Sequence, residues 1–139
     1  MKSATTTSAT GAITVTSFTP TEVRNVNGNT ITDFTQSANL VGTFTGTTAD
    51  VGTIVQHPTG DFNFKIRHTF TGTVDGKSGT MVLEVAGKGE GGVPGGTLRG
   101  QFVILSGTGE LANLHGQGNL DGIAGDGGTY SGQIHFDPR

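Results

Sequence analysis

Apolar and polar residues alternate most regularly between residues 62 and 74 of the chain. Apart from one histidine and one glycine, the even positions are apolar: Phe62, Phe64, Ile66, His68, Phe70, Gly72 and Val74. The odd positions are all polar or charged. A period of two predicts a β-strand with an apolar inner face and a polar outer face. His68 lies in the middle of the predicted inner face.

Turn-forming residues divide the rest of the chain into segments of strand length. They include Asn27-Gly28, Asp50, Asp75-Gly76 and the glycine-rich run 89–96. The segments between them predict strands near residues 12–18, 30–36, 39–48, 51–57, 62–74, 79–88, 97–105, 113–120 and 129–136. Eight or nine consecutive strands joined by short turns form an antiparallel meander, and closing the meander removes its exposed edges. We therefore predict an all-β fold, an eight-stranded antiparallel up-and-down barrel.

Composition supports this fold class and limits the number of domains. The chain has 139 residues, which is one domain's worth of material. Its 25 glycines and a similar number of threonines disfavour helix, because glycine costs about 1 kcal/mol in a helix and threonine loses rotamer freedom there. Residues 1–10 are nearly all Ser, Thr and Ala, so we expect a flexible tail before a single barrel domain at 11–139.

Charge and residue usage exclude several classes of partner. The net charge of −3 and the absence of a basic stripe argue against nucleic acid. There is no cysteine for a disulfide or a thiolate site, and no apolar run approaches the length of a membrane-spanning helix. Residues 1–10 lack the apolar core of a secretory signal. We expect a cytoplasmic protein with no membrane or nucleic-acid partner.

Two segments carry a resemblance to a known group of barrels. They are Gly-Lys-Ser-Gly-Thr-Met-Val-Leu at 76–83 and Ser-Gly-Thr-Gly-Glu-Leu-Ala-Asn-Leu-His-Gly at 106–116. Both resemble bacterial allene-oxide-cyclase-like barrel proteins, a domain of unknown function related in fold to plant allene oxide cyclases and dirigent proteins. The resemblance implies a calycin-type barrel with an apolar lumen open at one end. It also implies a small apolar ligand whose cyclisation or coupling is directed by the shape of the lumen.

His68 and Tyr130 are the two candidate catalytic residues on predicted inner faces. His68 would act as a general acid/base or as a hydrogen-bond donor to an oxygen that develops charge. A lone histidine on an apolar face is also a common core residue, and that alternative stays open. Tyr130, the only tyrosine, shares a face with Ile134 and Phe136, and its hydroxyl could reach a ligand at the mouth of the barrel.

Glu84 is a third catalytic candidate, and its role depends on which face of its strand is buried. If Met81, Leu83 and Val85 face outward, Glu84 points into the lumen, where burial would raise its pKa and make it a base. An exposed strand glutamate is the alternative. Glu110, after the Ser-Gly-Thr-Gly turn, is expected to accept backbone N–H bonds there.

The expected ligand-binding wall is aromatic and apolar, with no metal or cofactor. Its expected members are Phe44, Phe62, Phe64, Ile66, Phe70 and Phe102. The four histidines show neither i, i+2 nor i, i+4 spacing, so no metal site is expected. Two functions remain open: a cofactor-free cyclase, isomerase or stereocontrolling protein acting on an apolar substrate, and a carrier that only binds a hydrophobic ligand. A filled, purely structural barrel is a third interpretation.

Apolar residues on both faces of two strands suggest self-association. Val82 alternates with Met81 and Leu83, and Val103 alternates with Phe102 and Ile104. A single barrel buries only one face of each strand, so a second subunit would cover the other. We expect a homodimer or homotrimer.

Overall fold

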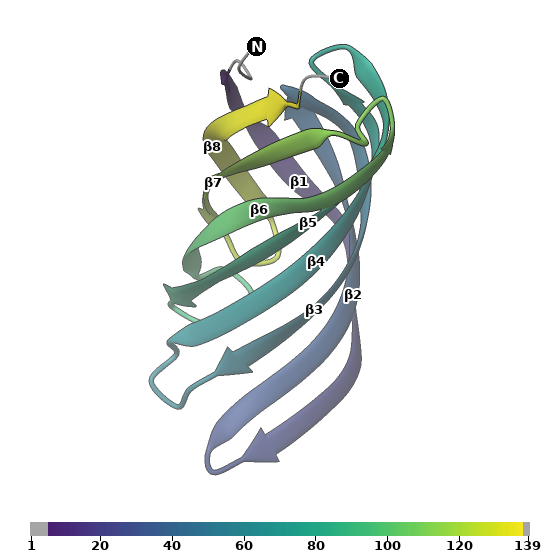
Figure 1. The fold of residues 1–139 in the computed structure, drawn as a ribbon. Helices are drawn as coiled ribbons and strands as arrows, with labels where there is room; N and C mark the ends of the chain where they lie inside the picture. The colour runs from purple at the N-terminus through teal and green to yellow at the C-terminus, as the bar shows by residue number, and fades with distance from the viewer. Residues whose placement is uncertain (1–5, 138–139) are drawn as a thin grey trace.

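Residues 6–137 are described by a computed structural model, in which they form eight β-strands and no helix (Figure 1). The strands are β1 (Thr7–Val26), β2 (Asn29–Gly42), β3 (Phe44–Gln56), β4 (Phe62–Val74), β5 (Lys77–Glu90), β6 (Thr97–Gly109), β7 (Leu114–Ile123) and β8 (Gly127–Phe136). Each strand pairs antiparallel with the next, and β1 also pairs with β8, so the sheet closes into a barrel. The predicted all-β, eight-stranded antiparallel barrel is confirmed. Within the described residues no helix is present that could cross a membrane.

The strand bounds match the predicted ones where apolar and polar residues alternate regularly. They differ where a single turn-forming residue was taken to end a strand. β4 has the predicted bounds, Phe62–Val74. The predicted strands 39–48 and 51–57 are wrong, because Asp50 lies inside β3 and not in a turn. The actual reversal follows Gly42, whose φ of 100° suits glycine and few other residues.

The N-terminal segment is ordered further than its composition suggested. Thr7–Thr10, which we expected in a flexible tail, are the first four residues of β1. They pair with β8 in a register that places Thr7 opposite Ile134. The prediction of a flexible segment up to Thr10 is therefore wrong for these four residues, while residues 1–5 lie outside the described part. Backbone pairing with a neighbouring strand orders a segment whose own side chains bury little apolar area.

The interior is filled by aromatic rings that lie over glycines. Gly118 of β7 shows the pattern, since a Cβ atom there would be 2.5 Å from a ring carbon of Phe102 and still closer to the carbonyl oxygen of Ser131. Several large side chains are less than 2% exposed: Phe34, Phe44, Phe62, Phe70, Met81, Leu111, Ile134 and Val74. Bare backbone on one strand thus makes room for a ring on the next, which explains why a glycine-rich chain still builds a dense core.

The two ends of the barrel differ. One end, here called the loop end, carries the β1–β2, β3–β4, β5–β6 and β7–β8 connections, and the opposite end carries both termini. Figure 1 shows the β1–β2 hairpin extending beyond the other connections at the loop end. β1 pairs with β8 only from Thr7 to Thr14, so its later residues pair with β2 alone in the described part of the chain.

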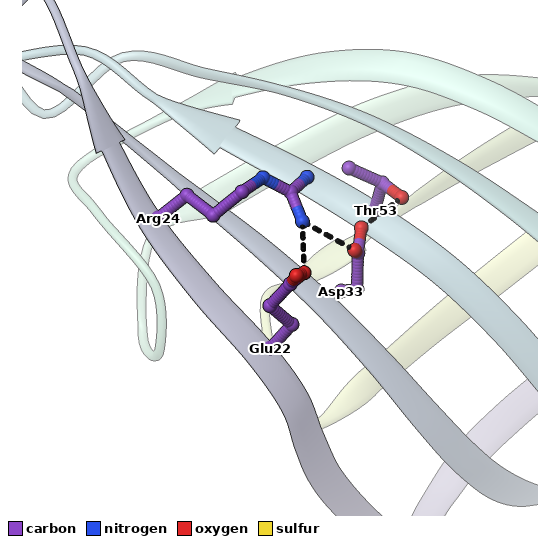
Figure 2. A network of polar contacts seen from close by, with 4 residues as sticks. All are labelled: Glu22, Arg24, Asp33 and Thr53. Carbon is purple, nitrogen blue, oxygen red and sulfur yellow. Dashed lines mark hydrogen bonds and ion pairs between the residues drawn. The ribbon is translucent and has the colours of Figure 1, made fainter.

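A polar network on the outer surface fastens the projecting hairpin to the barrel (Figure 2). Glu22 of β1 lies opposite Asp33 of β2, and two like charges in that position repel. Arg24 offsets this repulsion by donating to Glu22 at 2.7 Å and to Asp33 at 2.8 Å, while the Thr53 hydroxyl of β3 donates to Asp33 at 2.8 Å. The hydrogen bond from Arg24, followed by that from Thr53, lowers the pKa of Asp33. The network spans three strands.

Part of the apolar side-chain area lies on the outer surface. Met81, Leu83 and Val85 are buried inside the barrel, whereas Val103 and Leu105 on β6 are 41% and 49% exposed. The expected dimer or trimer stays a prediction.

Candidate functional site

His68 is the one histidine buried inside the barrel. It projects inward from β4, and its side chain is 5% exposed. Its Nδ1 atom lies 2.7 Å from Oδ1 of Asp50, whose side chain is fully buried on the neighbouring strand β3. The two residues are direct cross-strand partners in the β3–β4 register, so the sheet itself sets their contact.

A third strand extends this contact. Gln36 of β2 lies opposite Asp50 in the register, and its side-chain amide donates to Oδ2 of Asp50 at 2.9 Å. Both oxygens of the buried carboxylate therefore have a donor, which is the condition for keeping a charge inside a protein. Gln36, Asp50 and His68 form a polar row across three strands, hereafter the polar row.

The polar row fixes which nitrogen of His68 is available for chemistry. When Asp50 is ionised it only accepts hydrogen bonds, and Nδ1 of His68 then carries the proton and donates to it. Among the described residues no partner hydrogen-bonds to Nε2 of His68. In the neutral ring this atom has a free lone pair, and it is oriented by Asp50 in the way a carboxylate orients a catalytic imidazole.

His68, Ile13 and Leu120 line two small cavities in common. The first has a volume of about 60 Å³ and lies at the loop end, where Phe18, Val93 and Ala124 are among its lining residues. The second, of about 30 Å³, lies deeper, between His68, Thr48 and Tyr130. Both are lined mainly by apolar side chains. His68 is the polar side chain that the two cavities share.

Thr48 adds a second polar atom to the deeper cavity. It lies on the inner face of β3, two residues before Asp50, and is 4% exposed. Its Oγ1 is a buried side-chain atom for which no hydrogen-bond partner is present among the described residues. Leaving a buried hydroxyl without a hydrogen bond costs about 1–3 kcal/mol of stability. The Thr48 hydroxyl could therefore bind one polar group of a ligand in the deeper cavity.

The residues predicted to form the ligand-binding wall all face the interior. Phe44, Phe62, Phe64, Phe70 and Phe102 are at most 6% exposed, and Ile66 is partly buried. The structure divides them between the two cavities. Phe62, Phe64 and Ile66 line the cavity at the loop end, and Phe44 and Phe102 line the deeper one. Phe70 lines neither of these cavities and is fully buried in the core.

Tyr130 is held by the backbone of the β2–β3 connection. Its hydroxyl accepts the N–H of Phe44 at 2.9 Å and donates to the carbonyl of Val41 at 2.8 Å. The ring stacks on Phe44 with centroids 4.9 Å apart. Burial raises the pKa of Tyr130. Tyr130 also lines the deeper cavity, and both of the short hydrogen bonds of its hydroxyl join strands.

Glu84 lies outside the barrel, so of the two alternatives for this catalytic candidate the structure shows the exposed strand glutamate and not the lumen base. Its neighbours Leu83 and Val85 are buried, so alternation places Glu84 on the outer surface. There it pairs with Arg67 at 3.2 Å and Lys65 at 3.6 Å. The hydrogen bond from Arg67 is the main cause that lowers the pKa of Glu84, whereas a buried base would need a raised pKa.

Comparison with known proteins places this barrel in a family. The family described as "Protein of unknown function (DUF3224)" matches residues 9–134, which include all eight strands nearly in full. The chain belongs to the DUF3224 family. A solved structure from that family, a protein of unknown function from Shewanella oneidensis MR-1, has the same fold with a TM-score of 0.79. The two proteins are 20% identical, and the match covers 97% of this chain and 100% of the other.

The comparisons leave the chemistry of this DUF3224 protein open. No curated protein matches the chain. Neither the family model nor the Shewanella structure links it to the allene oxide cyclases, so that part of the expected relationship is not shown. At 20% identity the likeness to the Shewanella protein shows the fold alone.

Sequence reasoning found His68 but missed the residues that orient it. Asp50 was interpreted as a turn residue, although Phe44, Thr48, Asp50 and Ile54 continue one period of two. Apolar periodicity does not reveal this, because Val51 and Val55 lie on the opposite face of β3. Gln36 gave no signal either, because only the β2–β3 register brings it to Asp50. Glu110 accepts a backbone N–H as expected, but the donor is Ser78 of β5, at 3.0 Å, and not a residue of the turn.

Proposed function

We propose that this DUF3224 protein binds one small apolar carbonyl compound inside the barrel and that His68 moves a proton on it, in a cyclisation or isomerisation. The observation that carries the proposal is that His68 lines both apolar cavities while Asp50 holds its Nδ1 atom and no described residue hydrogen-bonds to its Nε2 atom. An imidazole oriented in this way is a general acid/base.

A carbonyl group matches both polar atoms that line the deeper cavity. The Thr48 hydroxyl donates to the carbonyl oxygen, and Nε2 of His68 accepts a proton from the adjacent carbon. The electron pair of the broken C–H bond forms a C=C bond, and the oxygen takes the negative charge that Thr48 stabilises. The imidazolium, whose charge Asp50 offsets, then returns the proton to the same carbon or to another carbon of the conjugated system. Return to another carbon is an isomerisation.

The size of the cavities restricts the ligand. Volumes of about 60 and 30 Å³ are smaller than the roughly 150 Å³ cavity that admits benzene. A five-membered ring therefore enters only if side chains at the loop end, such as Phe18 and Val93, move outward. These two residues come from the β1–β2 hairpin and from the β5–β6 connection.

A carrier without chemistry is the second candidate, and the positions of two side chains favour it. Tyr130 uses its hydroxyl to join strands, and Glu84 lies outside the barrel. The interior thus has one proton-transfer residue where the sequence suggested three. A carrier would use His68 and Thr48 only to hold the polar end of its ligand.

We also propose that the barrel is of the allene-oxide-cyclase-like, calycin type. Its simple up-and-down order of eight strands supports this, together with the resemblance of residues 76–83 and 106–116. Val103 and Leu105 on the outer surface support the proposal of a homodimer or homotrimer.

Binding is tested by titrating the protein with cyclopentanone while the imidazole nitrogens are followed by NMR. Methylcyclopentane is the matched ligand without a carbonyl. We expect a saturable shift at Nε2 of His68 with cyclopentanone, and affinity about tenfold or more lower for methylcyclopentane, since a lost hydrogen bond costs about 1–3 kcal/mol. Shifts confined to the outer surface, or no saturation, would refute binding in the barrel.

Proton transfer is tested by dissolving the complex in D₂O and measuring deuterium uptake at the carbons next to the carbonyl. The His68→Gln variant keeps an N–H donor for Asp50 but removes the basic nitrogen, and His57→Gln is the control at an outer histidine bonded to Asn29 and Asn63. Wild type and His57→Gln should catalyse exchange and His68→Gln should not. Binding without exchange in the wild type would establish the carrier instead.

A further inference from the structure

His115 and His135, which lie far apart in the sequence, face each other on the outer surface of the barrel. His115 is on β7 and His135 on β8, and they are direct partners in the β7–β8 register. Their rings stack with centroids 5.2 Å apart and planes inclined by 24°. A search for histidines spaced i, i+2 or i, i+4 along one strand does not detect such a cross-strand pair.

A carboxylate joins the two imidazoles. Oδ2 of Asp137 lies 2.6 Å from Nε2 of His115, and Oδ1 lies 3.4 Å from Nε2 of His135. The backbone of Asp137 is itself held, because its N–H donates to the carbonyl of Asn113 at 2.9 Å and its own carbonyl accepts from the Asn113 side chain. Both histidines therefore direct the same nitrogen toward one anchored carboxylate.

We propose that His115 and His135 bind a divalent transition-metal ion through their Nε2 atoms, with Asp137 turning to become the third ligand. Within residues 6–137 no three His, Cys, Asp or Glu side chains are arranged to hold a metal ion as they stand. Here the carboxylate lies between the two nitrogens and binds both. The rings are nearly parallel, so their nitrogen lone pairs do not yet converge. Rotation about the side-chain bonds of Asp137 and of both histidines would let one ion bind the two nitrogens, with one carboxylate oxygen as a ligand.

The donor set selects the class of ion. Two imidazoles and one carboxylate suit Zn²⁺, Ni²⁺ or Cu²⁺, and they do not suit Ca²⁺ or Mg²⁺, which prefer oxygen ligands. The side chains of His115, His135 and Asp137 are 53%, 36% and 50% exposed. An ion would thus enter from solvent and keep water in its remaining positions. Binding would link β7, β8 and the residue that follows β8.

The test uses protein made without a polyhistidine tag and stripped of metal with a chelator. Zn²⁺ and Ni²⁺ are titrated by calorimetry, and Cu²⁺ is examined by electron paramagnetic resonance. We expect one ion per chain and a Cu²⁺ spectrum with coupling to two imidazole nitrogens. His115→Asn and His135→Asn should each weaken binding by about tenfold or more, and Asp137→Asn should weaken it less.

Controls separate this site from general binding by surface histidines. His57→Asn alters an outer histidine at the other end of the barrel and should bind like the wild type. Zn²⁺ should raise the melting temperature of the wild type but not of His135→Asn. Equal weakening by His57→Asn, unchanged affinity in His115→Asn, or Cu²⁺ coupling to a single nitrogen in the wild type would each overturn the proposal. The Cu²⁺ spectrum needs no variant to fold.

Discussion

Tyr130→Phe removes a single oxygen atom from the barrel, and the structure indicates what that removal costs. The hydroxyl accepts the Phe44 N–H at 2.9 Å and donates to the Val41 carbonyl at 2.8 Å, and Tyr130 is 5% exposed. The phenylalanine ring would fill the same space and keep the stacking on Phe44. Two backbone groups would be left without this partner, each at about 1–3 kcal/mol. We expect the free energy of unfolding to fall by roughly 2–4 kcal/mol.

Urea denaturation followed by far-ultraviolet circular dichroism measures this loss. Fluorescence is unsuitable, because Tyr130 is the only tyrosine and the chain has no tryptophan. With a slope of about 1–3 kcal/mol per molar urea, the midpoint should fall by about 1–3 M. Thr69→Val, at an exposed outward position on β4, is the control and should change stability by about 0.5 kcal/mol or less. If the two variants unfold at the same midpoint, the hydroxyl does not join the strands as described.

Three further predictions follow from individual residues. Because burial raises the pKa of Tyr130, its tyrosinate absorbance should titrate above pH 10, and the stability it contributes should be present below about pH 10 and lost as pH rises through the folded pKa. Gly118→Val places methyl groups against the Phe102 ring and should lower the melting temperature by several degrees in a thermal scan. Arg24 lowers the pKa of Asp33, so the wild type should exceed Asp33→Asn in stability above about pH 4, and urea midpoints should converge as acid protonates Asp33.

The fold was predictable because the alternation of apolar and polar residues is a local property of each strand. The candidate site was not predictable in full, since its residues meet only through the pairing of strands. The alternation at residues 62–74 correctly predicted the bounds of β4 and the inward direction of His68. The direction of the Glu84 side chain could not be predicted, because both faces of the strand carry apolar residues between Val82 and Val85. Alternation alone therefore did not distinguish the inner face from the outer one. Asp50 and Gln36 reach His68 through the pairing registers of three strands. A single sequence does not specify such registers.

The joining of β1 to β8 also determines the order in which the barrel is expected to assemble. Every other strand pairing connects neighbours in the chain, so each can form as a local hairpin with a small loss of loop entropy. The β1–β8 pairing has eight residue pairs and brings together segments more than a hundred residues apart. It should therefore form last, after the hairpins have aligned. Amide hydrogens at residues 7–14 should then exchange with solvent faster than those of β4, whose two neighbours are both local.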